Sequence, residues 1–69
     1  MSDPQVRFVM RVCDAAPPDM EGMVSEAIFR AALRGDELEV ARIAKYLIAE
    51  MRREDLAADW TEHFGAMFS

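Results

Sequence analysis

The sequence predicts a small α+β fold that is mostly helical, with one N-terminal strand followed by two or three helices. Residues 5–13 alternate with a period of two, which is typical of a half-buried strand. From residue 18 onward the apolar residues recur instead at the spacing of amphipathic helices. With 69 residues, the chain forms a single small domain spanning 1–69. A core of that size supplies only about 3 to 5 kcal/mol of net stability.

The strand is expected over residues 5–13 and should end at the proline pair Pro17 and Pro18, because proline cannot continue a β-ladder. Its inner face would carry four apolar residues, Val6, Phe8, Met10 and Val12. Its outer face would carry Arg7, Val9 and Arg11. Because no second strand follows and the single cysteine cannot form an internal disulfide, we expect an intertwined homodimer. Its two copies of the strand would pair as an intersubunit two-stranded ribbon.

Three helices are expected, over residues 18–34, 36–53 and 55–67. Pro18 suits a first helical turn, and Gly35 suits the position just beyond a helix end. Asp36 followed by Glu39 matches a capping box at the start of the next helix. The apolar face of the last segment lies roughly 150° from that of the segment before it, at about 100° per residue. The chain should therefore bend near residues 52–55.

The first of these helices is apolar on two sides. Ala27, Ile28 and Ala31 belong to its broad apolar face, whereas Phe29 and Leu33 lie nearly opposite them. We interpret this arrangement as a helix sandwiched between two layers of the fold.

Composition and charge predict a cytoplasmic protein. Hydrophobic residues make up 52% of the chain and charged residues 30%, a balance typical of folded proteins. No apolar run approaches the roughly 20 residues of a membrane span, and the start "MSDPQ" lacks the features of a signal peptide. The formal net charge of −5 disfavours nucleic-acid binding, which draws its affinity from Lys and Arg contacts to phosphate.

A strand followed by two helices, with "RGDELE" at the turn between them, resembles the ribbon-helix-helix family over about residues 5–53. The resemblance implies a DNA-binding repressor whose ribbon residues Arg7, Val9 and Arg11 read the major groove. In such a complex the second helix would begin at the DNA backbone. Here it begins with an acidic cluster that would repel phosphate, so DNA binding is the alternative rather than the leading hypothesis.

The short, acidic, arginine-rich chain is also similar to the anti-activator class of small early proteins from Pseudomonas bacteriophages. The resemblance implies a non-enzymatic inhibitor that acts in the host bacterial cytoplasm. Proteins of that class bind a host LuxR-type quorum-sensing transcription activator, and they can also block the pilus-assembly ATPase. It therefore implies a host regulatory protein as the partner, in addition to the homodimer.

No catalytic, metal or cofactor site is expected. His63 lies four residues after Asp59, but this pair lacks a second histidine or a cysteine to complete a metal site. Serine, threonine and cysteine have no neighbouring base that would activate them as nucleophiles. Partner contacts are instead expected from adaptable methionines and from aromatic residues, namely Met20, Met23, Tyr46, Trp60 and Phe64. Packing in the core is the other role open to most of them.

Overall fold

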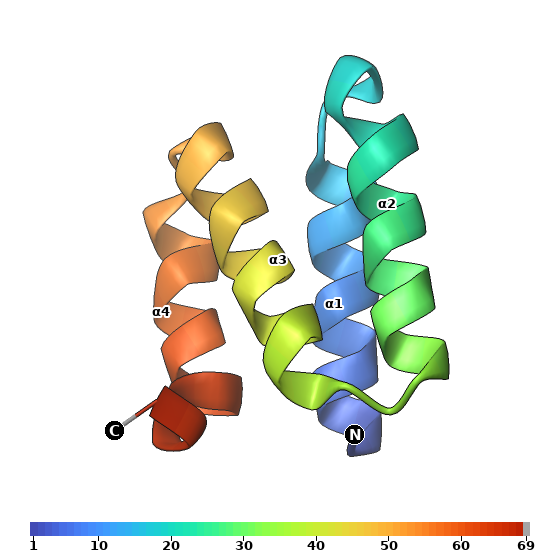
Figure 1. Cartoon of the computed structure of the whole chain (residues 1–69). Coiled ribbons are helices and arrows are strands. Elements are labelled where there is room, and N and C mark those ends of the chain that lie inside the picture. Colours follow the sequence, from blue (N-terminus) through green and yellow to red (C-terminus); the bar gives the residue numbers. More distant parts are fainter. Residues whose placement is uncertain (69) are drawn as a thin grey trace.

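A computed structural model describes the backbone of residues 1–68 and, apart from residues 20–23, their side chains. Within these residues the chain forms four α-helices, one short 3₁₀ helix and no strand (Figure 1). The elements are α1 (Asp3–Ala15), α2 (Pro18–Leu33), α3 (Glu37–Met51), α4 (Glu54–Phe64) and the 3₁₀ helix η1 (Gly65–Phe68). The fold is therefore all-α.

The predicted strand over residues 5–13 is wrong, because this segment is the body of α1. The Ser2 hydroxyl accepts a hydrogen bond from the Gln5 N–H (3.4 Å), and the Gln5 side-chain oxygen accepts one from the Ser2 N–H (3.0 Å). This capping box satisfies two otherwise unpaired backbone donors at the helix start. Pro4 lies in the first turn, where its missing N–H costs nothing. These local signals start a helix before the alternating segment begins.

Burial along α1 follows the helical period. Phe8, Val9 and Val12 are buried at 2%, 6% and 0% exposure, whereas Val6 and Met10 are exposed at 38% and 61%. The four residues expected on one inner face are therefore split between the core and the surface. The predicted intersubunit ribbon is wrong as well, since the segment that was to form it is a helix.

The turns that follow α2 and α3 each use a residue with positive φ. Gly35 has a φ of 72° just after α2, and the Asp36 side chain then accepts from the Glu39 N–H at 3.2 Å to cap α3. At the end of α3, Arg52 takes the left-handed conformation with a φ of 55°. Arg53 then donates its backbone N–H to the Ile48 carbonyl at 3.3 Å, and the chain turns into α4.

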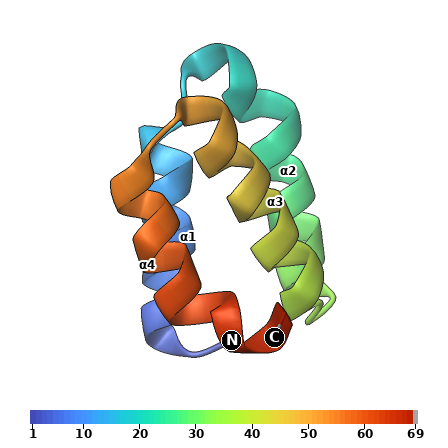
Figure 2. The same ribbon diagram turned by 90° about the vertical axis from the view of Figure 1, so that its left-hand side faces the viewer.

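The helices form two layers, α1 with α4 and α2 with α3 (Figure 2). Alanines on α3 allow close packing at the centre, where Ala41 and Ala44 have no exposed surface. Aromatic rings fill the α4 side, with Phe64 centred 6.2 Å from Phe8 and 6.1 Å from Trp60. The start of α1 and the helix η1 lie at the same end of the molecule (Figure 2).

None of the helices described in residues 1–68 combines the length and the apolar character needed to cross a membrane.

Candidate partner-binding surface

Large apolar side chains are exposed together on α1 and α2. The most exposed is Leu33 at 87%, followed by Phe29 at 68%, Met10 at 61% and Val6 at 38%. Exposed leucines are common on protein surfaces, but a group of large apolar side chains on one face is a feature of interaction sites. We call these four residues the α1–α2 stripe.

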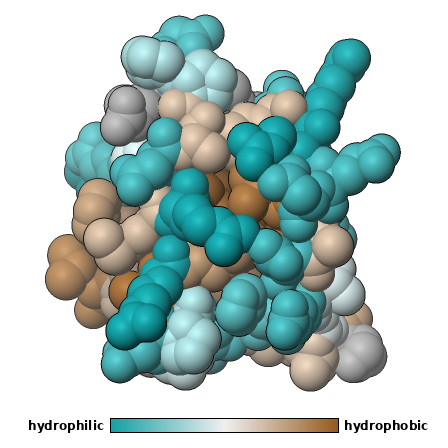
Figure 3. Space-filling model, turned by 180° about the vertical axis from the view of Figure 1, so that it is seen from behind, coloured by the Kyte–Doolittle hydropathy of each residue, from teal (hydrophilic) through white to brown (hydrophobic). Residues whose placement is uncertain are grey.

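Helix geometry places these residues in two pairs, one on each helix. Val6 and Met10 are four residues apart, as are Phe29 and Leu33, so each pair lies on one side of its helix about one turn apart. The helices α1 and α2 run in opposite directions (Figure 1). The early turns of α1 are thus level with the late turns of α2 (Figure 1). Apolar atoms accordingly appear at the left edge of Figure 3, where α2 lies.

The stripe residues lie on a different side of each helix from the residues that face the core. Val12 of α1 and Ile28 of α2 point inward, with 0% and 4% exposure. Phe29 follows Ile28 by one residue, and Leu33 follows it by five, so both are rotated by roughly 100° or more from the core direction at about 100° per residue. The side of α2 that we interpreted as facing a second layer is therefore not covered by any part of the chain that the structure describes.

Charged side chains border the stripe. Asp3 and Asp14 are exposed on α1, three residues before Val6 and four residues after Met10. On α2, Glu26 is exposed and accepts a 2.6 Å hydrogen bond from Arg30 in an ion pair one turn long. The exposed side chains of Arg7, Arg30 and Arg34 also adjoin the stripe, so its border carries both signs of charge, whereas the protein as a whole is acidic.

The residues predicted to contact a partner are scattered over the fold. Tyr46 is exposed at 57% on α3, a helix that carries no residue of the stripe. Trp60 and Phe64 are buried, with 5% and 0% exposure. They therefore pack in the core, which was the other role that the sequence allowed for them. The side chains of Met20 and Met23 lie outside the described residues. Sequence reasoning thus missed the stripe, although the two-sided pattern of α2 already separated Phe29 and Leu33 from the core.

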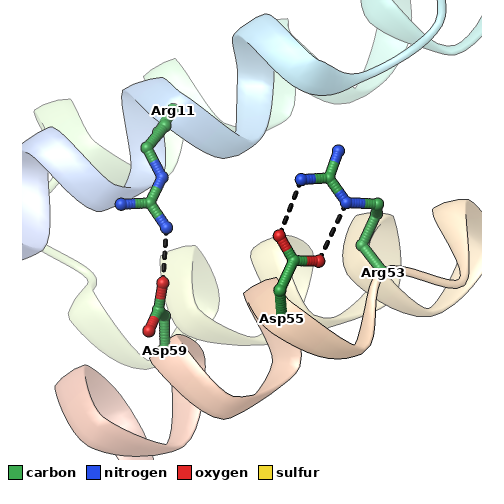
Figure 4. Close-up of polar contacts among 4 residues, drawn as sticks. All are labelled: Arg11, Arg53, Asp55 and Asp59. Carbon is green, nitrogen blue, oxygen red and sulfur yellow. Dashed lines mark hydrogen bonds and ion pairs between the residues drawn. The ribbon is translucent and has the colours of Figure 1, made fainter.

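The residues of the DNA-binding alternative do not form one outward row. Val9 is buried, and only Arg7 and Arg11 are exposed. Arg11 forms an ion pair with Asp59 of α4 (Figure 4). Its guanidinium carbon lies 5.6 Å from the centroid of the Phe8 ring. Reading of the major groove by a ribbon is therefore no longer supported by the fold.

A second ion pair anchors the start of α4. Arg53 donates two hydrogen bonds to the Asp55 carboxylate, at 2.9 and 2.7 Å (Figure 4). These bonds lower the pKa of Asp55 from 3.8 to about 2, because they favour the charged carboxylate. Both side chains are exposed, so the pair orients the α3–α4 turn more than it stabilises the fold.

The histidine region serves packing. The His63 ring lies 5.0 Å from the Phe8 ring, and the His63 carbonyl accepts a 3.0 Å hydrogen bond from the Gln5 side-chain amide. Asp59, which we considered with His63 as a pair of metal ligands, forms an ion pair with Arg11. Across the described side chains, no group of three histidine, cysteine or acidic residues could hold a metal ion.

Comparison of the chain with family models, with curated proteins and with solved structures yields no match.

Proposed function

We propose that this protein acts without catalysis, by binding another protein through the α1–α2 stripe. The observation that carries the proposal is the exposure of Phe29 and Leu33, at 68% and 87%, one turn apart on α2. Burying a side chain of this kind in an interface contributes about 1.5 to 3 kcal/mol. One turn apart on one helix, these two residues would form the central apolar contact of an interface.

The charge of the molecule restricts the kind of partner. The net charge is −5, although the border of the stripe carries both signs of charge. The net negative charge attracts a basic protein surface and speeds the encounter with it at low ionic strength. We therefore propose a partner that has an apolar ridge on a surface that is basic overall.

The narrower proposal is that this partner is a bacterial regulatory protein that the chain inhibits. The DNA-binding part of a transcription factor is basic and would be attracted to an acidic protein. A LuxR-type activator, or the pilus-assembly ATPase, is implied by the resemblance in length, acidity and arginine content to phage anti-activators. Occupation of the basic surface would keep an activator from its operator.

Self-association is the second use that we propose for the same surface. The homodimer expected from the sequence cannot use a strand ribbon, but two copies could cover each other's stripe in a two-fold arrangement. Sedimentation equilibrium at micromolar concentration separates the two uses. If the wild type is a dimer and Leu33→Ser makes it dissociate, the stripe serves self-association. If the wild type is a monomer, the stripe is free to bind another protein.

The decisive experiment is affinity capture from a bacterial lysate followed by mass spectrometry. The bait is the wild type, the double variant Phe29→Ser/Leu33→Ser, or the matched control Tyr46→Ser, which removes an exposed aromatic residue from α3. We expect a protein recovered by the wild type and the control to bind the double variant at least about 30-fold more weakly, as for central interface residues.

Circular dichroism verifies that all three baits are folded. Equal recovery by wild type and double variant would contradict the proposed surface. A captured regulator that still binds its operator at saturating bait would contradict the proposed inhibition but not the surface.

A further inference from the structure

A groove of about 470 Å³ lies between α3 and α4, the two helices that do not carry the stripe. Its wall on α3 includes Lys45, Ala49 and Arg52, and its wall on α4 includes Ala57 and Trp60. The α3 and α4 segments run in opposite directions next to each other (Figures 1 and 2). The volume falls in the range of roughly 300 to 1,000 Å³ that is typical of small-ligand sites.

The floor of the groove is apolar and held in place. Trp60 and Ile48 lie at the bottom with 5% and 3% exposure. The indole N–H of Trp60 donates a 2.8 Å hydrogen bond to the Ala41 carbonyl, which fixes the ring. Ala49 and Ala57 are exposed and have small side chains, so the space above the floor stays open. A flexible alkyl chain could occupy this space without moving the core.

The rim of the groove is basic, although the protein as a whole is acidic. It carries Lys45, Arg52 and Arg53 against the single acidic residue Glu54. Arg53 is neutralised by Asp55. Lys45 and Arg52 form no ion pair with any carboxylate among the described side chains, and the ammonium of Lys45 lies 4.7 Å from the centroid of the Trp60 ring. Two positive charges at an apolar groove match an anion with an apolar body.

We propose that this groove binds a small amphipathic carboxylate. Its alkyl chain would lie over Ala49, Ala57 and the edge of Trp60, where it leaves water. Its carboxylate would pair with Arg52, since a guanidinium binds a carboxylate through two parallel hydrogen bonds. Lys45, seven residues earlier, adds a second positive charge to the rim of the groove. The site is separate from the α1–α2 stripe, so it stands whether or not the protein partner proposed above exists.

The chain contains a single tryptophan, and it lies at this groove, so its fluorescence reports binding directly. We propose titrating the full chain with octanoate and with 1-octanol, which has the same alkyl length without the charge. Saturable octanoate binding is expected, with 1-octanol about tenfold weaker or more, since the alcohol lacks the charge-assisted hydrogen bonds of the carboxylate. Amide chemical shifts should change at Ala49 and Ala57.

Two variants test the two halves of the site. Arg52→Gln should weaken octanoate about tenfold and leave 1-octanol unchanged, whereas Ala57→Leu should fill the groove and abolish binding of both. Arg7→Gln, which removes an exposed arginine from α1, is the matched control and should bind like the wild type.

Equal affinity for octanoate and 1-octanol, or an Arg52→Gln variant that binds octanoate normally, would overturn the proposal. Shift changes at Phe29 and Leu33 instead of the groove would also overturn it. An acidic peptide that displaces octanoate and binds more tightly would reassign the groove to a protein partner and end the small-ligand proposal.

Discussion

The indole Nε1 of Trp60 donates a 2.8 Å hydrogen bond to the backbone carbonyl of Ala41, nineteen residues earlier in the chain. This bond is buried and joins α4 to the middle of α3. It satisfies the only polar atom of the indole ring, which could not otherwise be buried without cost. The α3–α4 groove and the aromatic core both depend on it.

Substitution of Trp60 tests this connection. Trp60→Phe removes the donor and part of the ring, and we expect it to lower the free energy of unfolding by about 2 kcal/mol. Urea denaturation followed by circular dichroism measures the change. Tyr46→Phe, which removes an exposed hydroxyl, should leave the stability within about 0.5 kcal/mol of wild type. A Trp60→Phe variant as stable as wild type would show that the bond contributes nothing.

The helical start of the chain rests on the Ser2 capping box. Ser2→Ala removes the hydroxyl that accepts from the Gln5 N–H, and the loss of such a cap costs about 1 kcal/mol. We expect reduced helical chemical shifts in the first turns of α1 and a matching loss of stability. Ser25→Ala within α2 is the control and should have no such local effect. Extended rather than helical shifts at Phe8 in the wild type would contradict α1 itself.

The Arg53–Asp55 pair predicts a titration. The pKa of Asp55 is lowered from 3.8 to about 2, so the stability that the pair contributes is complete above pH 4 and is lost as the pH falls toward 2. In carbon-detected NMR titrations, Arg53→Gln should return the Asp55 midpoint toward its ordinary value, because the hydrogen-bond donor is gone. The Arg7→Gln control should leave this midpoint in place. An Asp55 midpoint unaffected by Arg53→Gln would assign the low pKa to another cause.

Substitution of one buried leucine and one exposed leucine tests whether the stripe is exposed in solution. Leu47 is 1% exposed and Leu33 is 87% exposed. Leu47→Ala should cost about 2 to 5 kcal/mol because it leaves a cavity, and Leu33→Ala should change stability by less than about 0.5 kcal/mol. Chemical denaturation at several protein concentrations gives both values. A large, concentration-dependent loss for Leu33→Ala would show that a second copy covers the stripe.

Several features of the fold could be predicted because they depend on neighbouring residues. Asp36 followed by Glu39 marked the start of a helix, and the Asp36 side chain caps α3 as that pattern requires. The change of apolar face near residues 52–55 predicted a bend, and the left-handed Arg52 turns the chain there. The capping box of Ser2 and Gln5 was equally local, and it was the signal that the strand prediction overlooked.

The two-residue alternation of residues 5–13 was misleading because part of it fits both the period of a strand and the period of a helix. Phe8 and Val12 belong both to an alternating strand and to one face of a helix, so the placement of Val6, Val9 and Met10 separates the two. Val9 is buried at 6% exposure in the folded chain. The capping at Ser2 and the core formed with α3 and α4 decide in favour of the helix.

By itself, the sequence determined the helix caps, the chain breaks and the two-sided apolar pattern of α2, since these depend on contacts within a few residues. Only the tertiary structure decided which apolar face is covered. Trp60 is buried because Ala41 and Phe64 reach it, and Leu33 is exposed because no described segment packs over it. Burial depends on segments far apart in the chain, and periodicity within one helix carries no information about them.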